Sequence, residues 1–155
     1  MQVRHEFKHD AKTVFNILTN AEFLKKRAIA LGSIDANCNI NGLKITLIRQ
    51  REIKVPAVLS AFLNKIQTAT TSELWRQQDD GFNCDNSTEI DGAPLSINGN
   101  INLVPSANGC LFTANFETKA KIIFGKGKLQ KYAARTIAKE LELECQYTDD
   151  YLSSL

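Results

Sequence analysis

The chain is 155 residues long, a length that fits one domain with one hydrophobic core. Its 43% hydrophobic and 23% charged residues, with only 3 Pro and 8 Gly, exclude disordered, collagen-like and linker sequences. The formal net charge of +2 is too small to indicate nucleic acid as a partner, because nucleic-acid binding requires a dominant basic surface. We therefore predict a single globular domain over residues 1–155.

The cysteine pattern and the N-terminal sequence bear on the cellular environment. The four cysteines stand far apart without a C-x-x-C pair, which predicts reduced thiols rather than a zinc knuckle or a thioredoxin-type motif. The first residues are charged and alternating, unlike a targeting peptide, and no apolar run approaches the roughly 20 residues needed to span a bilayer. We expect a cytoplasmic protein.

The beginning of the chain predicts one strand and two short helices. Apolar and polar residues alternate from Val3 to Phe7, which is typical of a strand. Asp10 is positioned to cap a helix that begins at residue 11. Asn20 is positioned to cap a second helix, which ends before Gly32.

From residue 34 onward the hydrophobic period changes to two, which predicts strands joined by hairpins. Asn41-Gly42 is a favoured sequence for a tight hairpin turn, and Asn108-Gly109 supplies another. A short helical excursion is expected over residues 58–63, after Pro56. We predict six or seven antiparallel strands in all, the later ones over residues 34–40, 43–51, 66–77, 82–90, 97–103 and 110–121.

The last segment predicts a long helix with two apolar stripes. One stripe contains Ala134, Ile137, Ala138, Leu141, Cys145 and Leu152, and the other contains Leu143, Tyr147 and Tyr151. A helix that is apolar over so wide an arc has to lie in a groove. The order of elements therefore predicts an α+β fold, in which a curved antiparallel sheet wraps around the long C-terminal helix and two short helices follow the first strand.

The charges along this helix run against its dipole. Five lysines lie around its start, between residues 119 and 131, whereas five acidic residues lie toward its end: Glu140, Glu142, Glu144, Asp149 and Asp150. An interaction other than the dipole is expected to select that polarity. Lys126 and Lys128, next to two glycines, form a candidate contact with an anion or a membrane surface, and the alternative is a solvated basic turn.

Polar residues also fall on strand faces that can point inward. Arg49 and Arg51 continue the parity of Ile45 and Leu47, so a face that starts apolar ends in guanidinium groups. Such an arginine needs either a carboxylate of the fold or the acidic group of a ligand. Thr70 shares its parity with two other small hydroxyl residues, and parity alone leaves open whether that face points inward.

The order of elements and several local sequences resemble the START-related helix-grip superfamily (SRPBCC, the birch-pollen-allergen-like fold) and, more narrowly, an uncharacterised bacterial family within it. The resemblance covers essentially the whole chain. It is carried, in chain order, by Met1–Phe7 followed by Asp10, Arg51 with Pro56 and Phe62, Glu73-Leu74-Trp75, Asp80-Gly81, Ile122–Lys128 and Tyr151-Leu152.

The resemblance implies an internal, mostly apolar cavity between the bent sheet and the C-terminal helix. Relatives in the superfamily bind or move lipids, sterols, polyketides, quinones and plant hormones, and a minority catalyse cyclisation or hydrolysis in the cavity. The narrower family has no established activity to carry over. We therefore predict a non-catalytic protein, a monomer or weak dimer without a cofactor, that binds a small hydrophobic or lipid-like ligand.

The candidate ligand-binding residues are His5, Ile45, Leu47, Arg49, Arg51, Thr70, Trp75, Phe116, Ile137, Leu141 and Cys145. One alternative is an enzyme, a cyclase or hydrolase that uses the same cavity through His5 and a carboxylate. Another is an adaptor that meets a membrane or a protein through the basic loop 119–131. No metal site is predicted, because His5 and His9 do not share a helical face.

Overall fold

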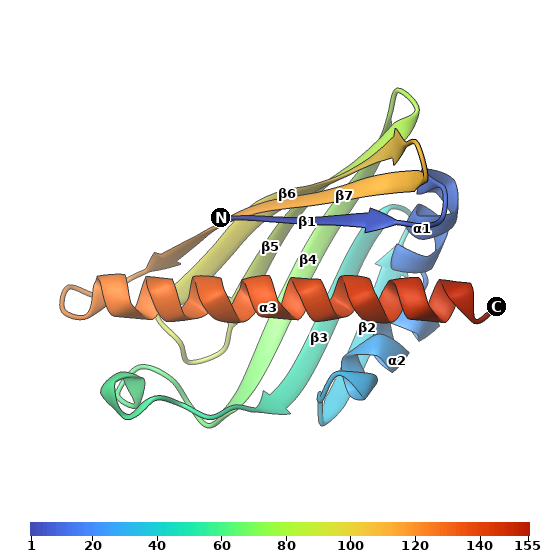
Figure 1. Cartoon of the computed structure of the whole chain (residues 1–155). Helices are drawn as coiled ribbons and strands as arrows, with labels where there is room; N and C mark the ends of the chain where they lie inside the picture. The colour runs from blue at the N-terminus through green and yellow to red at the C-terminus, as the bar shows by residue number, and fades with distance from the viewer.

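The structure is a computed structural model that describes residues 1–155 (Figure 1). Three α-helices, one short 3-10 turn and seven strands make up the chain. In chain order they are β1 (Gln2–Phe7), α1 (Ala11–Leu18), α2 (Ala21–Ala30), β2 (Asp35–Asn41), β3 (Lys44–Glu52), the 3-10 turn η1 (Ala57–Leu59), β4 (Ile66–Gln78), β5 (Gly81–Ile90), β6 (Leu95–Ser106), β7 (Gly109–Ala120) and α3 (Lys126–Ser153).

The strands form one antiparallel sheet in the order β1-β7-β6-β5-β4-β3-β2. From β2 to β7 each strand pairs with the next in the chain, as expected for hairpins, and β1 then pairs with β7. Gly109, the first residue of β7, lies against the end of β1, where a β-carbon would collide with the Phe7 carbonyl oxygen. The predicted series of antiparallel strands is confirmed.

Both predicted helix caps are confirmed. Asp10 accepts a hydrogen bond from the Thr13 amide at 2.7 Å and begins α1, and Asn20 accepts one from the Phe23 amide at 2.9 Å and begins α2. The two helices lie at one end of the sheet, near the end of α3 (Figure 1). Helix α1 buries Phe15, whose ring stacks on Phe82 with a centroid separation of 4.0 Å.

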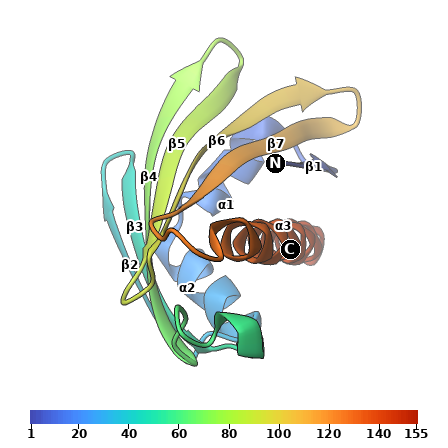
Figure 2. The same cartoon turned by 90° about the vertical axis from the view of Figure 1, so that its left-hand side faces the viewer.

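Figure 2 shows the sheet curving around α3, which lies against its concave side. Two apolar clusters hold the helix. Near its start, Leu129 and Ala133 pack with residues of the 57–63 excursion and the strand ends. Near its end, Cys145 and Leu152 join the main core with residues of α1, α2 and the sheet. This arrangement confirms the predicted α+β helix-grip fold, and it leaves the middle of α3 to face the sheet between the two clusters.

Two local expectations need refinement. The excursion contains a single 3-10 turn, and it buries Leu59 and Leu63 beneath the start of α3. The second helix stripe is only partly buried, because Leu143 is 47% exposed while Tyr147 and Tyr151 pack on Phe23 of α2. No helix combines the length and the apolar character needed to cross a membrane.

Candidate functional site

A cavity of about 150 Å³ lies between the concave side of the sheet and α3. Its wall is mainly apolar and is built from inward-facing residues of β1 and of strands β3 to β7, from the three helices and from the segment between β3 and β4. Eight of the predicted ligand-binding residues line it: Leu47, Arg49, Arg51, Trp75, Phe116, Ile137, Leu141 and Cys145.

The other three predicted residues lie outside this lining. On β4 the inward parity belongs to Ala69, Thr71 and Glu73, so Thr70 points to the opposite side of the sheet. Ile45 is only 1% exposed and packs within the main core rather than on the cavity wall.

His5 belongs to a separate polar cluster between β1 and α3. Its Nε2 lies 3.3 Å from Asp149 Oδ2, and its ring contacts Phe7 edge-on with centroids 4.6 Å apart. The Asp149 carboxylate also lies 3.7 Å from His9 Nδ1 and accepts a hydrogen bond from the Lys8 amide at 3.5 Å. The cluster fastens β1 to the last turns of α3, and no histidine lines the cavity.

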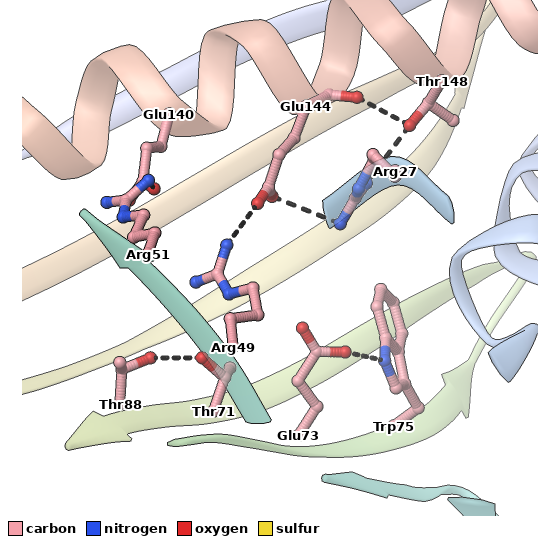
Figure 3. A network of polar contacts seen from close by, with 10 residues as sticks. All are labelled: Arg27, Arg49, Arg51, Thr71, Glu73, Trp75, Thr88, Glu140, Glu144 and Thr148. Atoms are coloured by element: carbon pink, nitrogen blue, oxygen red, sulfur yellow. Dashed lines mark hydrogen bonds and ion pairs between the residues drawn. The ribbon is translucent and has the colours of Figure 1, made fainter. Parts of the chain in front are cut away.

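A network of arginines and glutamates crosses the cavity from the sheet to α3 (Figure 3). The Glu144 carboxylate accepts a hydrogen bond from Arg49 Nη1 at 3.0 Å, and it lies 3.2 Å from Arg27 Nη2. It therefore pairs with two guanidinium groups. Arg27 also donates to the Thr148 hydroxyl at 3.2 Å. One turn earlier on α3, Glu140 pairs with Arg51. These pairs join β3 and α2 to the middle and end of α3.

The paired guanidiniums decide the charge of Glu144. Burial by itself raises the pKa of a carboxyl group, but Arg27, Arg49 and Arg51 together hold the pKa of Glu144 below its ordinary value. Burial and the like charge of Arg49 lower the pKa of Arg51. The network therefore keeps Glu144 as a carboxylate inside the cavity.

Glu73 on β4 has the opposite character. Its Oε2 accepts a hydrogen bond from Trp75 Nε1 at 2.9 Å, and burial raises its pKa despite that bond and the nearby arginines. Figure 3 shows its side chain rising from β4 on the same side of the sheet as Arg49. Glu73 thus brings to the cavity a carboxyl group whose pKa lies above its ordinary value.

Arg27 and Glu73 are not among the site residues predicted from the sequence, where Glu140 and Glu144 stand out only for their polarity along the helix. For three of these four residues, the sequence contains a pattern that could have indicated a place in the site. Glu73 shares strand parity with Trp75, and the two later glutamates recur four residues apart on the helix face that carries Ile137 and Leu141. Arg27 carries no such signal, because its role depends on where α2 crosses α3.

All four cysteines are free, and Cys145 lines the cavity. Burial raises the pKa of the Cys145 thiol to about 12. Since the thiolate is the nucleophilic form, this cysteine contributes an apolar surface rather than a reactive group.

The basic loop, residues 119–131, contains two highly exposed apolar side chains. Ile123 is 89% exposed and Phe124 is 85% exposed. The predicted contact residues Lys126 and Lys128 follow in the first turn of α3 and are exposed. Neither forms an ion pair, and neither do the three other lysines of the segment, Lys119, Lys121 and Lys131.

The sequence matches, over residues 2–152, the family described as "Protein of unknown function (DUF2505)". The chain belongs to this family. No curated protein matches the sequence. The DUF2505 match covers the sheet and nearly all of α3, so the cavity and its polar network lie entirely within the family region.

Solved structures share the fold at low sequence identity. A protein from Thermus thermophilus, TTHA0849, is similar with a TM-score of 0.70 and 13% identity, over 99% of this chain and 98% of that one. Human STARD10 is similar with a TM-score of 0.59 and 13% identity, over 99% and 67%. The di-domain ARO/CYC StfQ from the steffimycin biosynthetic pathway is similar with a TM-score of 0.59 and 12% identity, over 99% of this chain and 46% of that one. The DUF2505 chain thus has a START/SRPBCC-like fold, which confirms the resemblance read from the sequence.

Proposed function

We propose that this protein binds a small hydrophobic ligand, without catalysis, in the cavity between the sheet and α3. The observation that carries the proposal is the cavity itself, a mainly apolar space with a few convergent polar groups in the concave side of the sheet. Such a composition is typical of small-molecule sites. The fold shared with STARD10 and StfQ supports the same function.

The cavity volume favours a small ligand over a complete lipid. A cavity of about 150 Å³ holds an aromatic ring the size of benzene, whereas sites for drug-sized ligands start at about 300 Å³. The volume therefore favours a ligand of about the size of a ring with a short side chain.

The polar network also favours binding over a purely structural role. Removing several charges from water costs free energy, and well-packed apolar residues of similar volume often stabilise a fold as well or better. Three arginines that line one cavity are therefore poorly explained by stability alone. The cyclase or hydrolase alternative lacks its histidine in the cavity, since His5 pairs with Asp149 outside it.

The test fills the cavity with a side chain. Ala69 lines the cavity and the neighbouring Thr70 faces the other side of β4, so Ala69→Leu and Thr70→Leu form a matched pair. Isothermal titration with 3-phenyl-1-propanol is expected to show binding to the wild type and to Thr70→Leu. We expect the affinity to fall at least tenfold in Ala69→Leu, about 1.4 kcal/mol. Equal binding by all three proteins, or binding by none, would overturn the proposal.

A second function, contact with an anionic membrane, is favoured by the basic loop. The exposed Ile123 and Phe124 form an apolar tip, and the five lysines of residues 119–131 surround it without acidic partners. Aromatic and aliphatic side chains insert at the headgroup boundary, and each nearby lysine adds about 1 kcal/mol on an anionic surface. The tip lies at the end of the molecule where η1 packs beneath α3 (Figure 1).

Vesicle co-sedimentation tests this second function. We expect binding to vesicles of phosphatidylserine and phosphatidylcholine but not to phosphatidylcholine alone. Lys126→Glu with Lys128→Glu should weaken the interaction at least about tenfold, and Phe124→Ser should weaken it as well. Ile34→Ser, which changes a 59% exposed apolar residue elsewhere, serves as the control. Insensitivity to the lysine changes would rule out this function.

A further inference from the structure

Arg49 uses only part of its hydrogen-bonding capacity. Its Nη1 donates to Glu144 at 3.0 Å, whereas Nε is buried without a hydrogen-bond partner and Nη2 donates no hydrogen bond. The Arg49 side chain is only 17% exposed, so bulk water does not supply the hydrogen-bond acceptor that Nε lacks within the protein. A buried polar group left without a partner is costly, which makes this unpaired edge of the guanidinium unusual.

The unpaired atoms belong to one edge of a planar fork. An arginine presents Nε–H and a neighbouring Nη–H side by side, and a carboxylate accepts both hydrogen bonds at once. Arg49 lines the cavity, and Figure 3 shows its side chain rising from β3 toward α3 with Glu144 on one side. Glu144 occupies one end of the guanidinium, so the edge formed by Nε and Nη2 has no acceptor within the protein.

The charges on the cavity wall support the same conclusion. Arg27, Arg49 and Arg51 face two paired carboxylates, those of Glu140 and Glu144. The third carboxyl group on the wall, that of Glu73, forms no ion pair with these arginines, and burial raises its pKa. The arginines on the wall therefore outnumber the carboxylates that pair with them.

Resting on the binding function proposed above, we infer that the ligand is a small monocarboxylate, whose carboxylate binds the Nε and Nη2 edge of Arg49. Its apolar part lies along the wall formed by Ile97, Ile101, Phe116 and Leu141. The ion pair between Arg49 and Glu144 orients the guanidinium group, so the Nε and Nη2 edge is positioned before the ligand enters. A neutral ligand leaves that edge unpaired and gains only apolar burial.

The experiment compares two probes with the same ring and chain, 3-phenylpropionate and 3-phenyl-1-propanol, by isothermal titration at pH 7. Hydrogen bonds to charged groups predict that the wild type binds the acid at least about tenfold more tightly than the alcohol. If the alcohol binds as tightly as the acid, the inference is overturned and the binding function stands. If neither probe binds, both fall together.

Arg49→Lys assigns the preference to the guanidinium edge. Lysine keeps the charge and can still reach Glu144, but it lacks the fork. We expect affinity for the acid to fall about tenfold while affinity for the alcohol changes less than about twofold. Arg76→Lys, at an exposed pair with Asp85, is the control and should retain the full preference. An unchanged preference in folded Arg49→Lys overturns the assignment; if that variant does not fold, the wild-type acid-to-alcohol ratio decides.

Discussion

Glu144 holds two guanidinium groups with one carboxylate, and both arginines come from elements far away in the chain. Its contribution therefore differs from that of a surface ion pair. When one partner of a buried pair is removed, the remaining charges keep the cost of leaving water and lose the attraction that offset it. The identity of this single residue thus bears on both the stability of the fold and the position of Arg49.

Replacing Glu144 by Gln is expected to lower the free energy of unfolding by about 2–4 kcal/mol, because Arg27 and Arg49 lose their shared carboxylate. Urea unfolding followed by circular dichroism measures the change. The control is Asp85→Asn, whose pair with Arg76 is 49% and 62% exposed on its two sides. That exposed pair should contribute less than about 1 kcal/mol. Equal effects of the two substitutions would contradict the assigned role of Glu144.

Glu73 predicts a dependence of stability on pH with a defined sign. Its pKa is raised in the folded protein by burial, so the folded state keeps the proton when the unfolded state releases it near the ordinary value of 4.5. This contribution is complete at low pH and is lost as pH rises through the folded pKa. The wild type should therefore lose stability relative to Glu73→Gln as pH rises above about 4.5. Unfolding curves between pH 4 and 8 measure the difference, and a wild type that gains stability relative to Glu73→Gln would refute the prediction.

Glu144 predicts the reverse trend in acid. Its folded pKa is lowered, with burial opposed by the stronger attraction of three arginines, so its contribution is present above the ordinary value and lost as pH falls through the folded pKa. Glu144→Gln should therefore lose less stability than the wild type on acidification below about pH 4.5. The same unfolding series, extended to lower pH, checks this, and parallel curves for the two proteins would count against it.

At the scale of elements, α3 is held at its two ends and carries the site in its middle. Leu129 anchors one end and is completely buried, whereas Leu143 on the same helix is 47% exposed. Three of the five acidic residues toward the end of the helix, which oppose its dipole, have partners elsewhere in the fold. Glu140 and Glu144 pair with arginines of the sheet and α2, and Asp149 lies against His5. These tertiary partners outweigh the smaller dipole effect.

Leu129→Ala should destabilise the protein by about 2–5 kcal/mol, because the cluster beneath the start of α3 loses apolar contacts and gains a void. Leu143→Ala should change stability by less than about 1 kcal/mol, since a side chain that is already half exposed loses little burial. Thermal and urea unfolding of both variants measure the contrast. A small effect at Leu129 would mean that the first anchor is not needed.

At the scale of the whole molecule, much of the fold could be predicted because it depends on short sequence patterns. The alternation of strands, the turn at Asn41-Gly42 and the caps at Asp10 and Asn20 all act within a few residues. The pairing of Arg27 with Glu144 could not be predicted, since it joins residues more than a hundred positions apart through the crossing of α2 and α3. The inward face of β4 also required the assembled sheet, because Thr70 and Ala69 fit either side equally well.

The binding function predicts a change in the stability of the whole molecule. A ligand that binds only the folded state adds about 2.7 kcal/mol at a hundred times its dissociation constant. The melting temperature of the wild type should therefore rise with the concentration of 3-phenylpropionate, and that of Ala69→Leu should rise less at the same concentrations. Differential scanning calorimetry measures both. A melting temperature that stays constant at saturating probe would contradict binding to the folded state.

The position of α3 after the sheet in the chain has a consequence for synthesis of the protein. While the ribosome makes residues 1 to 120, the concave side of the sheet lacks α3, and only α1 and α2 can cover one end of it. β1 must also wait for β7, its only neighbour in the sheet, so the pairing joins segments made at very different times. The nascent chain therefore exposes the apolar concave side of the sheet until α3 leaves the exit tunnel. Chaperones that recognise apolar strands should bind it longest at that stage.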